Sequence, residues 1–239
     1  MHFVKTILPL IAILLLASCD DGRIDETHTY VADGRTVRLT ATVRGTDTWP
    51  RGYDLALAGF ADASDYASVV RLLRPDDDGT LDVTLGGIPA DVTTVELCVL
   101  NTLHQRVATY ARLTSADLTR SGTIPFDAGT ADVAMFRALQ TQLFDLRCTS
   151  CHGGSDHSAR GLYLTDGRSY DALVGVPSRH QPDQVLVQPG NSRSSLLYQV
   201  LTTDLTATWG QPHTDMLSPD KDSHLLNLLH DWIQNGATR

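Results

Sequence analysis

Residues 35–44 read RTVRLTATVR, and their pattern sets the expected fold of the first half of the chain. The apolar positions are Val37, Leu39, Ala41 and Val43, and the polar positions between them are Arg38, Thr40, Thr42 and Arg44. Alternation with a period of two places the apolar side chains on one face of an extended chain. The stretch therefore predicts an antiparallel strand that is buried on one face.

Similar alternation recurs along the next seventy residues. It is found at residues 53–57, 81–85, 92–100 and 106–113. Turn-forming residues separate these runs, as in PDDDG at 75–79 and LGG at 85–87. Short alternating strands with regular turns are typical of a β-sandwich, so we expect an Ig-like all-β sandwich over residues 30–129.

From about Thr130 the apolar spacing changes to that of helices. Thr130 can cap a helix that runs into Cys148, with an apolar face formed by Phe136, Leu139, Leu143 and Leu146. A second helix follows Ser218 and Pro219 near the end of the chain. The expected fold class is therefore multidomain, with the β-sandwich followed by an all-α domain over residues 130–239.

The N-terminus has the pattern of a bacterial lipoprotein signal. Residues 1–18 contain a short charged head and an apolar run, and Leu16-Ala17-Ser18-Cys19 resembles a lipobox. This predicts a cleaved signal peptide, lipid on Cys19 and a polar tether over residues 19–29. The expected location is outside the cytoplasm, on the periplasmic or cell-surface side of a bacterial membrane. The alternative is a plain secretory signal with a chance cysteine.

Charge argues against one class of partner. The 239 residues carry a net charge of -9 and contain no run of Lys or Arg. Binding to a phosphate backbone needs clustered cations, so no nucleic-acid partner is expected.

Residues 147–161, RCTSCHGGSDHSARG, contain the pattern Cys148-x-x-Cys151-His152. Two thiols at this spacing can bond the two vinyl groups of one haem, and the adjacent imidazole can ligate its iron. The motif therefore predicts one covalent haem c. A zinc site is one alternative, for which His157, His180 or His213 could supply further ligands. A redox dithiol is the other, although a helix is expected before this motif rather than a strand.

A second axial ligand is expected from the chain that follows. Met216 lies in a loop before the last helix and is the preferred candidate, with His213 as the alternative. Met135 is expected to pack in the first helix. Cys98 lies in an alternating run and is expected to be a buried core residue.

The second half of the chain resembles a known family. CTSCHGG, GLYL, YDALVG, VQPGNSRSSLLYQVL and HDWIQNGA, all within residues 131–239, are similar to class I cytochrome c domains of exported bacterial proteins. The resemblance implies an all-α fold with crossing first and last helices, haem in the cleft, and His152 and Met216 as axial ligands. The family usually has Pro after its distal Met, whereas Leu217 follows here.

These features predict a membrane-anchored monohaem c-type cytochrome that carries single electrons by outer-sphere transfer to a redox protein partner, and not an enzyme. One alternative is a haem sensor or a peroxidase-like enzyme with an open iron position. Another is a surface lipoprotein whose sandwich recognises a partner through aromatic residues such as Trp49, Tyr53 and Tyr66.

Overall fold

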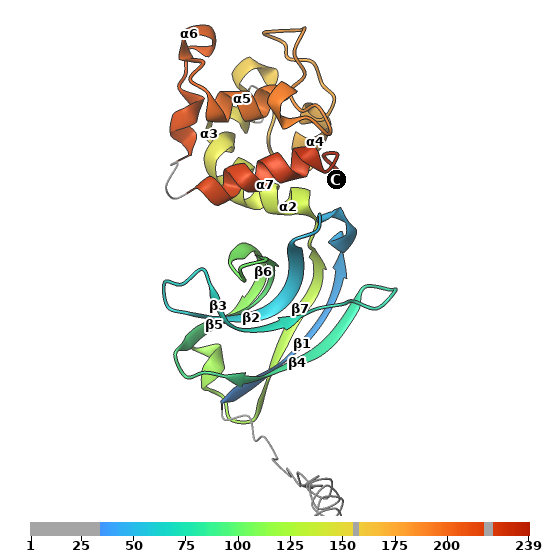
Figure 1. Cartoon of the computed structure of the whole chain (residues 1–239), viewed down its shortest axis with the longest axis vertical. Coiled ribbons are helices and arrows are strands. Elements are labelled where there is room, and N and C mark those ends of the chain that lie inside the picture. The colour runs from blue at the N-terminus through green and yellow to red at the C-terminus, as the bar shows by residue number, and fades with distance from the viewer. Residues whose placement is uncertain (1–33, 155–157, 218–221) are drawn as a thin grey trace, which may run out of the picture. The chain divides into compact units, whose positions relative to one another are not determined.

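A computed structural model describes residues 34–154, 158–217 and 222–239, except for the side chain of Trp209. Figure 1 shows two sheets followed along the chain by short helices. In the described part of the chain, no helix combines the length and apolar character needed to cross a bilayer. The predicted signal peptide, tether and lipidated Cys19 fall on residues outside this description.

Seven strands form the two sheets. They are β1 (Arg35–Arg44), β2 (Tyr53–Ala61), β3 (Ala67–Leu72), β4 (Thr80–Ile88), β5 (Val92–Asn101), β6 (Arg106–Leu113) and β7 (Thr123–Asp132). One sheet has the order β4-β1-β7, with β1 antiparallel to β4 and parallel to β7. The other has the order β3-β2-β5-β6 and is antiparallel throughout.

Alternating apolar side chains from both sheets meet in one hydrophobic core. Fully or almost fully buried members include Val37, Leu39, Leu57, Leu97 and Ile124. β1 shows the pattern most clearly, because its residues from Val37 onward alternate between buried and exposed. The apolar positions that alternate in the sequence are therefore the positions that are buried in the structure.

The four-stranded sheet is also buried on its second face. Ala56, Phe60 and Cys98 belong to a small cluster there and are fully buried. The ends of β3 and β6 meet at this face, where the Ala67 amide donates to the His104 carbonyl at 3.0 Å and the Arg106 amide donates to the Asp65 carbonyl at 2.7 Å. Because the sheet closes on itself here, Cys98 lies in a core, as its sequence context indicated.

A buried charge lies beside this cluster. Glu96 in β5 is fully buried and accepts a 2.6 Å bond from the Thr109 hydroxyl. Two guanidinium groups reach the same carboxylate, Arg106 at 3.0 Å and Arg112 at 3.2 Å. A buried carboxylate requires such pairing, so replacing either partner would leave charge without full compensation.

Short helices and turns form the rest of the described chain. They are η1 (Thr46–Thr48), η2 (Asp117–Thr119), α2 (Met135–Leu139), η3 (Gln140–Cys148), α3 (Thr149–His152), η4 (Ala159–Gly161), α4 (Ser169–Leu173), η5 (Ser192–Ser194), α5 (Leu196–Thr202), α6 (Thr206–Trp209), η6 (His213–Met216) and α7 (Ser223–Gln234). η3 is a π-helix, and η1, η2, η4, η5 and η6 are 3₁₀ turns.

The predicted fold class, an Ig-like sandwich followed by an all-α cytochrome c domain, is wrong. Strands make up 34% and helices 31% of the structure, the helices are few and short, and no all-α cytochrome c domain is evident in the residues that the structure describes. Glycines and prolines interrupt residues 153–191, so a helical period is not sustained there. Isolated β-bridges instead join Val174 to Val187 and Pro177 to Val185.

Packing provides a second reason for this correction. The core cluster that holds the inward residues of both sheets also contains Met135, Leu143 and Trp232 from the helices. Residues 33–239 accordingly form one compact unit. The predicted boundary between residues 129 and 130 stays a prediction. Thr130, the expected helix cap, lies within β7, and α2 begins only at Met135.

Aromatic side chains of the sheet region bond directly to the helical region. The Trp49 indole N–H donates to the Val133 carbonyl at 2.6 Å, and the Tyr53 hydroxyl donates to the Asp231 carboxylate of α7 at 2.6 Å. Trp49 and Tyr53 also pack together with their ring centroids 5.3 Å apart. These two aromatics therefore have a structural role.

Gly79 lies in the turn before β4, in a backbone conformation that favours glycine. Its φ of +84° is unfavourable for other residues, and an added Cβ would collide with the Val43 carbonyl oxygen. We expect Gly79→Ala to lower the free energy of unfolding by about 2–4 kcal/mol, from left-handed strain plus the collision. Denaturant unfolding measures this change.

Gly122 supplies the matched control. Its φ is +77°, but an added Cβ would meet nothing within 4 Å. Gly122→Ala should therefore cost only about 1–2 kcal/mol, the strain alone. Equal losses for the two variants would contradict this account of the turn.

Candidate functional site

The motif Cys148-x-x-Cys151-His152 lies at a junction of two helical geometries. Cys148 ends the π-helix η3, and α3 then carries Thr149 to His152. The Thr149 amide donates to the Phe144 carbonyl five residues earlier, which is the wide turn of a π-helix. Such turns occur frequently at functional sites.

Gly153 ends α3 directly after the motif. A Cβ at this position would collide with the Thr149 carbonyl oxygen. The chain therefore turns closely against the helix as soon as it leaves His152, and only glycine fits without a shift of the backbone.

The two motif thiols are free and differ in environment. Cys148 is half-buried, packs against the core, and its Sγ lies 3.7 Å from the Leu143 carbonyl oxygen. Burial raises the pKa of the Cys148 thiol to about 12, and the neighbouring Cys151 contributes to the increase. Cys151 is exposed. The pair therefore offers one accessible and one sheltered sulfur three residues apart.

His152 is oriented by the backbone. Its Nδ1 lies 3.2 Å from the carbonyl oxygen of Leu162. This contact orients the imidazole ring, and Nε2 is the second ring nitrogen. Burial lowers the pKa of His152 below its usual value, and nearby His213 lowers this pKa further. A neutral imidazole with Nδ1 engaged is the form that ligates a metal.

Sequence reasoning missed the segment that holds His152. The Leu164 amide donates to the His152 carbonyl at 2.8 Å, two residues beyond the Leu162 carbonyl that faces the ring. Leu164 is in turn bonded to the side chain of Gln140, which is almost fully buried. No signal in the sequence singles out Gln140, because Thr141 and Gln142 beside it are also polar.

The π-helix changes which residues of η3 face the core. Phe136, Leu139 and Leu143 are buried as the helical period predicted. Leu146 was expected on the same face but is 70% exposed, while Phe144 is fully buried. Wider turns rotate successive side chains by a smaller angle than an α-helix does, so the apolar face moves along the sequence.

The turn η6 contains both candidates for the second axial ligand. His213 is its first residue and Met216 its last. Residues three apart are eclipsed in a 3₁₀ turn, so these two side chains share one edge. His213 lies near enough to His152 to lower the pKa of that imidazole electrostatically. Met216 is 43% exposed, whereas Met135 is fully buried in α2 as expected.

The zinc alternative requires further ligands near the motif. In residues 34–154, 158–217 and 222–239, no group of three or more His, Cys, Asp or Glu side chains is placed to hold a metal ion. His157, one of its candidates, lies outside this description. Cys98 is remote from the motif in the sequence and is buried in β5.

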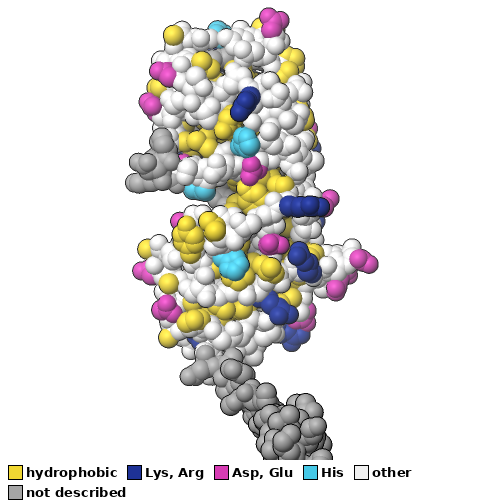
Figure 2. Space-filling view, viewed as in Figure 1, with side chains coloured by type: hydrophobic (Ala, Val, Ile, Leu, Met, Phe, Trp, Pro, Cys, Tyr) yellow, Lys and Arg dark blue, Asp and Glu magenta, His cyan; other side chains and the backbone are white. Residues whose placement is uncertain are grey.

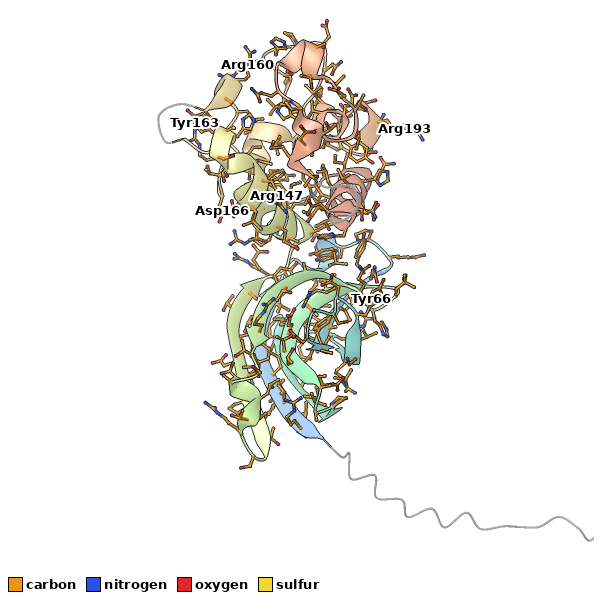
Figure 3. All side chains as sticks on the ribbon, turned by 90° about the vertical axis from the view of Figure 1, so that its left-hand side faces the viewer. Tyr66, Arg147, Arg160, Tyr163, Asp166 and Arg193 are labelled. Atoms are coloured by element: carbon orange, nitrogen blue, oxygen red, sulfur yellow. The ribbon has the colours of Figure 1, made fainter. Side chains whose placement is uncertain are left out.

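Exposed large apolar side chains are few in the described chain. Figure 3 shows Arg147, Arg160 and Tyr163 in the region that carries the motif, and Tyr66 in the sheet region. The exposed large apolar residues of the described chain are Tyr66, Leu72, Leu103, Leu146 and Met216. In the view of Figure 2, hydrophobic side chains reach the surface in several separate groups. Of the aromatic residues suggested for partner binding, Tyr66 alone is more than half exposed.

Comparison with known proteins adds no assignment. No protein-family model matches the chain, and no curated protein matches it.

The difference between the thiols gives a prediction for the haem-free chain. At pH 8, iodoacetamide should modify Cys151 first and Cys148 at least about tenfold more slowly, because the thiolate is the reactive form and burial disfavours it at Cys148. Cys98, whose thiol pKa is also raised by burial, should react only after unfolding. Peptide mass spectrometry over time measures the three rates. Equal rates at Cys148 and Cys151 would contradict the structure.

Proposed function

We propose that the protein is an exported, lipid-anchored monohaem c-type cytochrome that carries single electrons. The observation that supports this proposal best is the donor set on one short stretch of chain. Two free thiols, Cys148 and Cys151, adjoin an imidazole, His152, whose Nδ1 faces a backbone carbonyl. Covalent haem attachment needs this combination of residue types at this spacing.

The surroundings of the donor set fit such a group. Cys148 and Leu162 pack against the hydrophobic core, so apolar side chains adjoin the motif. Burial lowers the pKa of His152, which favours the neutral imidazole that a metal ligand requires. Cys148 and Cys151 would hold the porphyrin, and His152 would ligate through Nε2. When bound, haem supplies a one-electron iron couple.

In electron transfer, the chain would then orient the His152 imidazole and limit the access of water to it. The Leu162 carbonyl holds the His152 ring, and the hydrogen bond from Nδ1 increases the electron-donating character of the other nitrogen. Leu164, whose amide donates to the His152 carbonyl, is buried and would limit the access of water to this side of the imidazole. No bond to a substrate is made, so the proposal places the protein among electron carriers rather than enzymes, with a redox protein as its partner.

Met216 is the proposed second axial ligand, and His213 is the alternative on the same edge of η6. A thioether with an imidazole gives a higher potential than two imidazoles. The considerable exposure of Met216 favours one second candidate function, a sensor or peroxidase-like enzyme in which the iron keeps an open position.

The proposed location rests on the sequence of the first nineteen residues. Lipid on Cys19 would anchor the chain on the periplasmic or cell-surface side of a bacterial membrane. Covalent attachment of haem to a CxxCH motif also belongs to exported proteins in bacteria, so the two proposals are consistent.

Haem attachment is tested by producing the full chain together with a bacterial haem-attachment system. The pyridine haemochrome spectrum and the intact mass should show one covalent haem per chain. The double variant C148S/C151S should lose covalent haem entirely, because no thioether can form. Cys98→Ser is the control, since a core cysteine should be irrelevant to attachment. A colourless wild-type chain with both motif thiols open to alkylation would refute the proposal.

The second ligand is tested in the haem-loaded chain by Met216→Ala, with His213→Ala as its matched partner. We expect M216A to convert the ferric spectrum from low spin to high spin and to permit rapid binding of carbon monoxide in the ferrous state, while H213A leaves both unchanged. The reverse pattern would assign His213. A high-spin wild-type spectrum would favour the open-iron alternative.

A further inference from the structure

The side chain of Gln140 joins three separate parts of the chain next to the motif. Its Nε2 donates to the Leu164 carbonyl at 2.9 Å and to the Asp145 carboxylate at 2.7 Å. Its Oε1 accepts a hydrogen bond from the Ser169 hydroxyl. Both neighbours of the nitrogen are acceptors and the neighbour of the oxygen is a donor, so the orientation of the amide is determined.

Gln140 is also buried, and a buried amide depends on its hydrogen bonds more than an exposed one does. It is 1% exposed, and Leu164 is 2% exposed. A buried amide without partners is costly, so its three bonds hold the side chain in one arrangement. Asp145 is five residues further along η3, which is the spacing of one π-helical turn. The same amide therefore spans the wide turn and reaches across to residue 164.

The segment bonded to Gln140 is the one that orients His152. The Leu164 amide donates to the His152 carbonyl at 2.8 Å, and the Leu162 carbonyl lies 3.2 Å from Nδ1 of the ring. A shift of residues 162–164 would move both contacts at once. Gln140 itself has no bond to His152, so any effect on the imidazole must pass through this segment.

Two other side chains contact this stretch or the residues directly after it. Arg137 pairs with Asp166 at 2.6 Å, but both side chains are exposed to solvent, where ion pairs contribute little. Ser158 also donates to the Leu162 carbonyl, the acceptor that His152 uses. Gln140 supplies the buried connection from the preceding helix.

The geometry points to Gln140 as a positioning residue: its side-chain amide holds residues 162–164 against η3 and thereby fixes the orientation of the His152 imidazole. This inference rests on the proposed function in so far as His152 is an axial ligand. Its structural half, the hold on residues 162–164, can be measured without any haem.

The test compares Gln140→Met with Gln142→Met in the full chain. Both changes replace an amide with an apolar side chain of similar size in η3, and each removes a bond to a backbone carbonyl. Gln142 donates to Val107 in β6 at 3.1 Å rather than to the segment beside His152. The control therefore removes the same kind of side-chain bond to a backbone carbonyl, but it removes one bond rather than three, from a partly buried residue, and at a different target.

In the haem-free chain, hydrogen exchange at the Leu164 amide is the readout. Q140M should accelerate it about tenfold, the effect of losing roughly one hydrogen bond, and Q142M should leave it unchanged. Unchanged protection in Q140M, or equal acceleration in both variants, would overturn the inference. Ser169→Ala removes only the bond to Oε1 and should accelerate exchange at the Leu164 amide by a smaller factor. This variant provides the measurement if Q140M does not fold.

In the haem-loaded chain, the midpoint potential and the ferric electron paramagnetic resonance spectrum are the readouts. Q140M should shift both, because the bond to Nδ1 and the plane of the ring change, and Q142M should shift neither. Faster exchange at Leu164 with an unchanged potential and spectrum would overturn the link to His152. Failure of the wild-type chain to take up haem would instead overturn the proposed function, and the exchange result would still decide the structural half.

Discussion

The carbonyl group of Val133 fixes the position at which the chain passes from the sheets to the helices. Val133 is fully buried, and its oxygen accepts bonds from the Trp49 indole at 2.6 Å and the Tyr110 hydroxyl at 3.1 Å. Its amide continues the pairing of β7 with β1 by donating to Arg44. Because α2, η3 and α3 follow without a break, the orientation of this one peptide determines where the motif lies on the core.

Backbone groups hold the candidate site in the same way. The His152 ring faces a carbonyl, the His152 carbonyl accepts from an amide, and a buried side chain secures the segment that provides both. The backbone carbonyl that faces the ring is present whatever side chain stands at residue 162, so the orientation of the imidazole depends on how the segments pack. Burial has a second effect here, because it keeps the imidazole neutral while it raises the pKa of the Cys148 thiol.

Periodicity predicted the strands better than the fold. Five of the strands were recognisable because an apolar residue at every second position also faces the core, as β1 shows. β7 was not anticipated: Pro125 interrupts its pattern, and Thr130 resembled a helix cap. The all-α expectation failed because it rested on two helical patterns and a family resemblance, whereas the chain between them forms short helices and bridges, where Gly and Pro prevent long helices.

In the candidate site, too, the features set by neighbouring residues could be predicted, whereas those set by distant residues could not. Cys148, Cys151 and His152 are adjacent in the chain, so their spacing alone indicates which chemistry they can support. The groups that orient them come from residues that are distant in sequence, and a backbone acceptor such as the Leu162 carbonyl has no residue type that would reveal it. Gln140 shows the same limit: it stands beside the polar residues Thr141 and Gln142, and only the structure shows that it is buried and bonded to Leu164.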